Sequence, residues 1–127
     1  MHAKVREADM ELAAKLQIKP GAQVAVVAAR AHGPDLSGLG PQAAGPGTAD
    51  AVIAFVARAA EITELAAPAI AAAREDKVAW IAYPKAGQLG TDINRDSLAE
   101  AVSGLGIRPV RQVALDAVWS ALRFRPA

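Results

Sequence analysis

The sequence predicts an α/β fold, a shortened doubly wound sandwich with three parallel strands, a C-terminal antiparallel hairpin and helices on both faces. Three apolar runs rich in β-branched residues alternate with stretches of helical spacing, and two further strand-like runs end the chain. The length of 127 residues suits a single domain, 1–127. Alanine supplies 32 of the hydrophobic residues, so we expect helices and sheet to pack closely around a thin core.

The N-terminal part of the chain predicts one helix, one strand and a long loop. Apolar residues recur at helical spacing up to Leu16, and the turn at 19–21, Lys-Pro-Gly, ends this helix. The apolar run 22–29 predicts a strand buried on both faces. Residues 30–49 hold five of the ten glycines and three of the eight prolines, which predicts an irregular loop with one helical turn near 34–39.

Two further strands and a helix are expected in the middle of the chain. Strands are predicted at 50–56 and 77–83 from their apolar, β-rich composition. A helical stripe at 62–73 lies between them. Since Pro68 lacks a backbone donor and clashes with the preceding turn, this stripe should be a kinked helix or two short helices.

The last part of the chain predicts a helix and a hairpin. The helix ends near Leu105, with Asn94 as its N-cap and Asp96 in its first turn. Strands at 110–115 and 118–124 form the hairpin. The residues between them, Asp-Ala, give weak turn chemistry because neither is glycine or asparagine.

Composition argues against several classes of function. Fourteen lysines and arginines against thirteen acidic residues give a net charge of +1, so neither nucleic acid nor a membrane is expected as a partner. The absence of cysteine removes disulfides, a thiolate nucleophile and a cysteine zinc site, and with two histidines we expect no metal site. No signal peptide or membrane span is recognisable, so a cytoplasmic protein is expected.

The first strand-to-helix turn lacks the features of a cofactor site. In doubly wound folds this turn carries glycines that let the backbone approach a phosphate or a ribose. Here it contains only Gly33 and the loop histidine His32, for which the sequence offers no nucleophile to activate. A formal G-x-G-x-x-A match at 38–43 contains a proline and precedes no helix, so we interpret it as a coincidence and expect no cofactor.

Polar chemistry is most concentrated between the third strand and the following helix. The candidate ligand-binding residues are Tyr83, Lys85, Thr91, Asp92 and Arg95. They follow a strand's carboxyl end, where an α/β fold places its ligand groups, and Lys85 with nearby helix N–H groups would suit an anion or a carboxylate. The alternative, which we favour, is that the polar residues here cap the helix and pair locally.

The last strand offers a candidate interface. Trp119, Arg123 and Arg125 alternate onto one face, where the ring and guanidinium groups could contact another subunit or stack a ligand ring. The opposite face, with Leu122 and Phe124, is expected to be core. The simplest interpretation is a cross-strand aromatic residue covered by arginine stems, with a dimer contact as the second.

Four segments together resemble a small bacterial family of unknown function. They are the Lys-Pro-Gly turn at 19–21, Tyr-Pro-Lys at 83–85, the Thr-Asp and Arg-Asp pairs at 91–92 and 95–96, and Trp-Ser-Ala-Leu-Arg-Phe at 119–124. The resemblance spans nearly the whole chain and implies a core similar to a truncated methyltransferase or Rossmann-like fold. It implies no activity, and the loop at 30–49 departs most from it.

These observations lead to two main hypotheses about function and to a third, weaker one, a nucleic-acid-associated protein, which would show salt-dependent binding to DNA or RNA. The first is a non-catalytic binding or interaction module, a homodimer or a binder of a protein partner, that has lost its cofactor loop; on this hypothesis the protein is not an enzyme. The alternative is a binder of a small anion or carboxylate, or an enzyme, that uses the polar segment 83–96.

Overall fold

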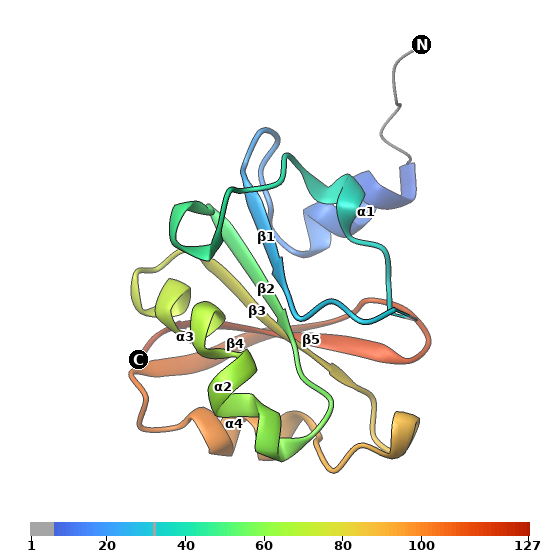
Figure 1. Cartoon of the computed structure of the whole chain (residues 1–127), viewed down its shortest axis with the longest axis vertical. Coiled ribbons are helices and arrows are strands. Elements are labelled where there is room, and N and C mark those ends of the chain that lie inside the picture. The colour runs from blue at the N-terminus through green and yellow to red at the C-terminus, as the bar shows by residue number, and fades with distance from the viewer. Residues whose placement is uncertain (1–6, 32) are drawn as a thin grey trace.

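One mixed sheet of five strands organises the computed structural model, which describes residues 7–31 and 33–127 (Figure 1). Its order is β1-β2-β3-β5-β4, with β1, β2 and β3 parallel and with β5 antiparallel to both of its neighbours. The strands are β1 (Val24–Val27), β2 (Ala51–Phe55), β3 (Val78–Pro84), β4 (Ile107–Ala114) and β5 (Trp119–Pro126). The predicted fold class is therefore confirmed.

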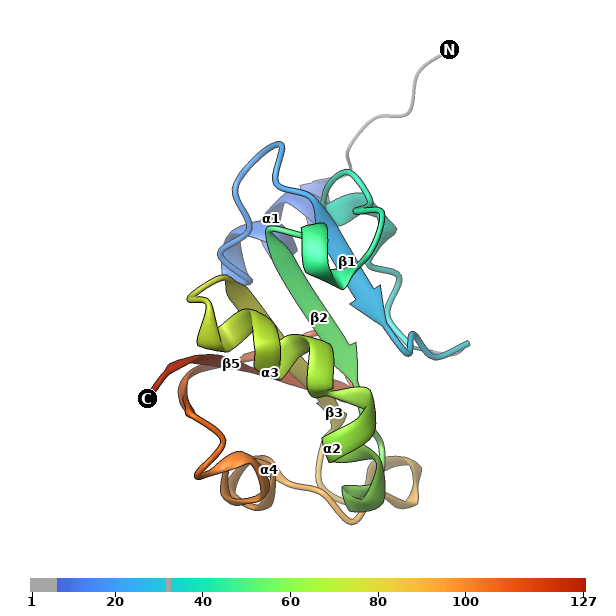
Figure 2. The ribbon, with the colours of Figure 1, turned by 60° about the vertical axis from the view of Figure 1, so that its left-hand side comes forward.

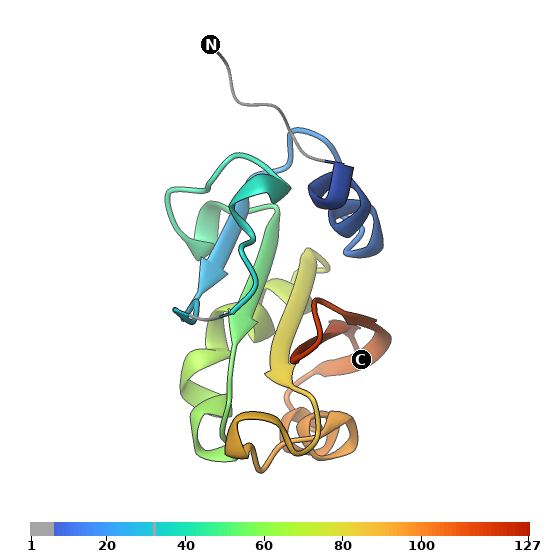
Figure 3. The ribbon, with the colours of Figure 1, turned by 90° about the vertical axis from the view of Figure 1, so that its right-hand side faces the viewer.

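Helices cover both faces of the sheet. On one face lie α2 (Ile62–Leu65), α3 (Ala67–Arg74) and α4 (Arg95–Val102) (Figure 2). On the other lie α1 (Glu7–Lys15) and the short 3-10 turn η1 (Ser37–Leu39) (Figure 3). Within the described residues, none of the helices has the length and apolar character needed to cross a bilayer.

Local sequence accounts for where the helices begin and break. Pro68 divides the predicted helical stripe, and it occupies the first turn of α3, where its missing N–H needs no partner. Asn94 caps α4 as expected. Its side chain accepts from the Ser97 backbone N–H at 2.8 Å, and its own N–H donates to the Ser97 hydroxyl at 2.9 Å.

The loop between β1 and β2 is tied to the edge of the sheet. Beside η1 it contains a second 3-10 turn, η2 (Pro46–Thr48). The Val24 N–H donates to the Pro41 carbonyl at 2.8 Å, and the Ala43 N–H donates to the Val24 carbonyl at 3.0 Å. Irregular backbone thus covers part of the outer edge of β1, which limits its pairing with another chain.

The core has two parts that differ in side-chain size. Beneath α2, α3 and α4 it is rich in alanine, with Ala54, Ala73 and Ala79 at most 1% exposed. On the α1 side it is filled by Trp80, Trp119 and Phe55. The Phe55 and Trp119 rings meet edge to face, with centroids 5.1 Å apart.

A buried hydrogen bond attaches the N-terminal helix to the sheet, and it gives a test of the fold. The Trp80 indole N–H donates to the Leu16 carbonyl at 2.9 Å. We expect Trp80→Phe to lower the free energy of unfolding by about 2 kcal/mol, because a buried carbonyl loses its partner and the ring loses volume. Urea denaturation measures this. Met10→Ala, at a side chain that is 61% exposed, should change stability by less than about 0.5 kcal/mol; equal effects of the two substitutions would contradict the assignment.

Candidate functional site

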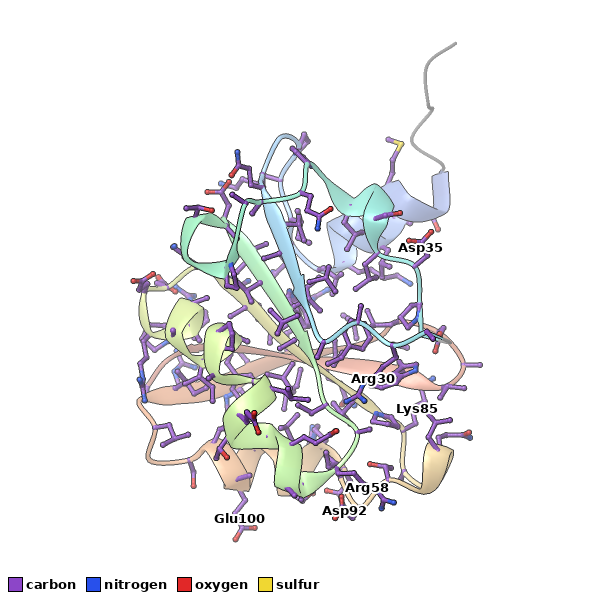
Figure 4. The ribbon with its side chains drawn as sticks, in the orientation of Figure 1. Arg30, Asp35, Arg58, Lys85, Asp92 and Glu100 are labelled. Carbon is purple, nitrogen blue, oxygen red and sulfur yellow. The ribbon has the colours of Figure 1, made fainter. Side chains whose placement is uncertain are left out.

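The carboxyl ends of the three parallel strands meet at one edge of the sheet, where this fold class places its ligands. Segments 28–31, 56–61 and 85–92 leave β1, β2 and β3 at this edge, which we call the strand-end edge. Figure 4 shows Arg58 and Asp92 close together there, with Arg30 and Lys85 nearer the sheet. Most of the predicted site residues belong to this edge.

Thr91 and Asp92 fasten the loop after β3 to the loop after β2. The Thr91 hydroxyl donates to the Ala57 carbonyl at 2.6 Å and accepts from the Ile93 N–H at 3.1 Å. The Asp92 carboxylate accepts from the Ala59 N–H at 2.8 Å, at the start of the short 3-10 turn η3 (Ala59–Glu61). Both side chains therefore bind backbone of their own chain.

Arg58 and Glu61 extend this set of bonds. The Arg58 guanidinium donates to the Gly90 carbonyl at 2.8 Å. The Glu61 carboxylate accepts from the Ala57 and Arg58 N–H groups at 2.8 and 3.1 Å and from the Arg30 guanidinium at 2.9 Å. We call the contacts of Arg58, Glu61, Thr91 and Asp92 the strand-end clasp, because they join the segments that follow all three parallel strands.

The electrostatics of Glu61 follow from these contacts. The Ala57 N–H, with further help from the Arg58 N–H and the Arg30 guanidinium, lowers the pKa of this carboxyl below its ordinary value near 4.5, against an opposing effect of burial. Since both partners in the ion pair are 31% exposed, Glu61 is bonded but not isolated from water. These contacts therefore stabilise the ionised form of Glu61 in the folded protein.

Tyr83, Lys85 and Arg95 lie apart from the clasp. Tyr83 is 2% exposed, its hydroxyl accepts from the Gln112 amide at 2.7 Å, and burial raises its pKa. The backbone N–H of Lys85 donates to the Val118 carbonyl at 2.7 Å. Arg95 is exposed and donates to the Asp96 carboxylate at 3.2 Å. The predicted residues therefore fall into separate groups.

The predicted interface residues also take separate positions. Trp119 is 1% exposed and belongs to the core, so its indole offers no surface to a ligand ring, and both faces of the last strand contribute core residues. The Arg123 guanidinium donates to the Gln17 amide oxygen. Arg125 binds the Asp76 carboxylate through two contacts of 3.0 Å. Each of the two arginines therefore binds a side chain of its own chain, and Trp119 is a core residue.

Two open clefts indent the surface. One, of about 440 Å³, lies along β1 and the following loop and is lined in part by Val26, Arg30 and Ser37. The other, of about 430 Å³, lies between α4 and β4 and is lined in part by Arg95 and Gln112. Of the five predicted ligand residues, only Arg95 lines either of these two clefts. Among the described residues no group of three or more histidine and acidic side chains could hold a metal ion.

The glycine-rich match in the loop has a packing explanation. A Cβ on Gly40 would lie 2.7 Å from the Ala22 carbonyl oxygen and 3.3 Å from a Val24 methyl group, so this glycine allows the loop to approach β1 closely. The match therefore does not need a phosphate to explain it. His32, the loop histidine considered above, lies outside the described residues.

Sequence patterns missed part of the clasp. Arg30, Arg58 and Glu61 stand in three different stretches with no motif among them, and only the parallel register brings their loops together. The position of Glu61 three residues after Arg58, at the start of a helical stripe, was the available signal, since this spacing is typical of a helix N-terminus.

In comparisons with known proteins, the chain matches no protein-family model, no curated protein and no solved structure.

The strand-end clasp can be tested through its acid. We expect Glu61→Gln to lower the free energy of unfolding at pH 7 by about 1 to 2 kcal/mol, because charge-assisted bonds to Arg30 and two backbone N–H groups are weakened. Because the pKa of Glu61 is lowered on folding, its contribution is complete above about 4.5 and disappears as the pH falls through the folded value. Denaturant titrations between pH 7 and pH 3 should therefore show the difference shrinking with acid.

The control is Glu64→Gln, which removes the same charge from an exposed position on α2. It should have little effect at pH 7. A loss as large as that of Glu61→Gln, or a Glu61→Gln difference that does not change with pH, would show that the clasp does not depend on this carboxylate.

Proposed function

We propose that this protein is a non-catalytic binding module. The observation that carries the proposal is the strand-end clasp, which occupies the edge where a doubly wound fold would bind a cofactor. The Thr91 hydroxyl and the Asp92 carboxylate, which a ligand would need, are bound to backbone within 2.6 and 2.8 Å. A ligand that used these groups would first have to break the hydrogen bonds that join the loops after β2 and β3.

The connection from β1 to β2 supports the same proposal. Phosphate and ribose groups are commonly held by the N-terminus of the helix that follows the first strand. Here the described residues of this connection form only the three-residue 3-10 turns η1 and η2. Too few aligned peptide groups are present in such turns to form a strong anion site.

The surface suggests what kind of partner the module binds. Among the described residues the exposed large apolar side chains are Met10, Leu89 and Val110, which lie on different elements. Stable homodimers and permanent complexes usually bury a continuous apolar area. We therefore place recognition in charged surface groups rather than in an apolar dimer contact, and the proposed relation to an uncharacterised bacterial family adds no activity to this.

The proposal predicts that common cofactors do not stabilise the protein. A ligand that binds only the folded state raises the melting temperature, so ATP, NAD and S-adenosylmethionine at millimolar concentration should each shift it by less than about 1 °C in a thermal-shift measurement. A saturable rise of several degrees with any of these compounds would overturn the proposal. A Thr91→Val variant, which loses the bond to Ala57, should melt earlier than the wild type and stay equally insensitive to the cofactors.

A second candidate function is a small-anion or carboxylate site in the cleft between α4 and β4. One observation favours it: Arg95 and Gln112 line this cleft, and the Gln112 amide also binds the buried Tyr83 hydroxyl, which fixes its position. Guanidinium groups bind carboxylates and phosphates in a bidentate manner. This candidate needs neither the clasp nor the strand-end edge.

Titration of phosphate or acetate into isotope-labelled protein tests the second candidate. It predicts saturable amide shifts at residues 95–99 and 110–112, and Arg95→Gln should weaken binding at least about fivefold because the guanidinium that would bind the anion is gone. Asp96→Asn, the matched change at the neighbouring acid, should not weaken it. Shifts that do not saturate, or that spread equally over the surface, would remove this candidate.

A further inference from the structure

The hairpin of β4 and β5 carries four arginines on one face. The register pairs Arg108 with Arg125 and Arg111 with Arg123 across the two strands. Directly paired residues share a face, as do Arg123 and Arg125, two positions apart on β5. An irregularity between Pro109 and Arg111 inserts one residue, so Arg108 and Arg111, three positions apart, also reach this face. We call these four residues the arginine face.

Among the residues that the structure describes, acidic partners neutralise only part of this charge. Arg125 is paired with Asp76, and Arg123 donates to the neutral amide of Gln17. Arg108 and Arg111 are exposed and have no ion pair or side-chain hydrogen bond with the described residues. Like charges directly opposite one another destabilise a strand pair, so this arrangement opposes folding.

Arg123 sits at the most crowded point of the arginine face. Burial, together with the charges of Arg125 and Arg111, lowers its pKa, and only Asp76 works in the other direction. Its Nε atom is buried without a hydrogen-bond partner. An anion bound beside Arg111 and Arg123 would reduce the repulsion between their positive charges and balance part of that charge.

The remaining acids lie mainly elsewhere on the molecule. Within the hairpin the acid is Asp116, in the turn, where it accepts from the Val118 and Trp119 N–H groups at 2.8 and 2.7 Å. Glu64, Asp96 and Glu100 belong to α2 and α4, on the opposite face of the sheet, and Glu100 points away from the sheet in Figure 4. Glu11 of α1 lies on the same side as the arginines, but the acid that acts on Arg123 is Asp76. A net charge of +1 therefore conceals a local excess of positive charge.

We propose that the arginine face binds the phosphate backbone of a nucleic acid without reading its sequence. The assignment rests on the proposed function, because it names the partner of the binding module. It also replaces the expectation from net charge, since phosphate binding depends on how charge is distributed over the surface rather than on its sum. Guanidinium groups suit phosphate oxygens in geometry as well as in charge.

A nucleic acid fits this face better than an acidic protein does. Protein interfaces depend on aromatic and apolar anchors at their centre. The nearby large aromatic residues, Trp80 and Trp119, are at most 1% exposed, so they offer no such anchor and no platform for stacking a base. Contacts to a phosphate backbone require neither, and they carry no sequence information.

Fluorescence anisotropy with a labelled DNA duplex of arbitrary sequence tests the proposal on the full chain. With about three phosphates contacted, the slope of log K against log salt concentration should lie near −3, and dissociation constants should fall between about 10⁻⁶ and 10⁻⁴ M at physiological salt and lower in low salt. Replacing Arg108 and Arg111 together by glutamine should weaken binding at least about tenfold and bring the slope closer to zero by about two. Both side chains are exposed, so the variant should fold, which its melting temperature checks.

Arg58→Gln is the control for a loss of positive charge elsewhere, because it removes a guanidinium at the strand-end edge, far from this face along the sheet. It should leave both the affinity and the slope unchanged. Equal losses in the control and in the double variant, or a strong preference for one DNA sequence, would overturn the proposal. So would tighter binding, at matched charge concentration, to polyglutamate or to vesicles containing phosphatidylserine.

The two proposals fail in different ways. If duplex binding is absent in low salt while cofactors still cause no thermal shift, the arginine face is not a nucleic-acid site and the binding module stands. If a cofactor raises the melting temperature by several degrees, the binding module fails whatever the DNA titration gives.

Discussion

The structure depends on the hydrogen bonds that join the ends of its three parallel strands. Parallel strands need long connections, and a helix usually supplies the rigidity of each one. The connection from β1 to β2 lacks such a helix, and the ion pair of Arg30 with Glu61 joins the segments after these strands instead. Thr91 and Asp92 attach the segment after β3 to the same place. These contacts therefore connect the segments that follow all three parallel strands.

The core side chains on the two faces of the sheet differ in size. On the side of α2, α3 and α4, small residues such as Ala69 and Ala73 let helix and sheet approach closely. On the other side α1 is the single α-helix among the described residues, and Trp80, Trp119 and Phe55 fill the space beside it.

Positive charge is concentrated on one part of the surface, the hairpin of β4 and β5. The strands of the hairpin carry four arginines on one face, and the acid that pairs with this face among the described residues is Asp76. The paired arginines oppose folding, and an external anion would remove that penalty. Binding through phosphates requires no catalytic group and no pocket.

The sequence by itself determined the fold class, the break at Pro68, the N-cap at Asn94 and the approximate strand positions, because each depends on periodicity or on local backbone chemistry. The functional surfaces depended on tertiary structure. Thr91 and Asp92 were predicted as polar residues of a site, but their partners, Ala57 and Ala59, are more than thirty residues away. Burial of Trp119 required both layers to be in place. Arg108 and Arg111 would lie on opposite faces of a regular strand, and only the irregular register with β5 brings them together.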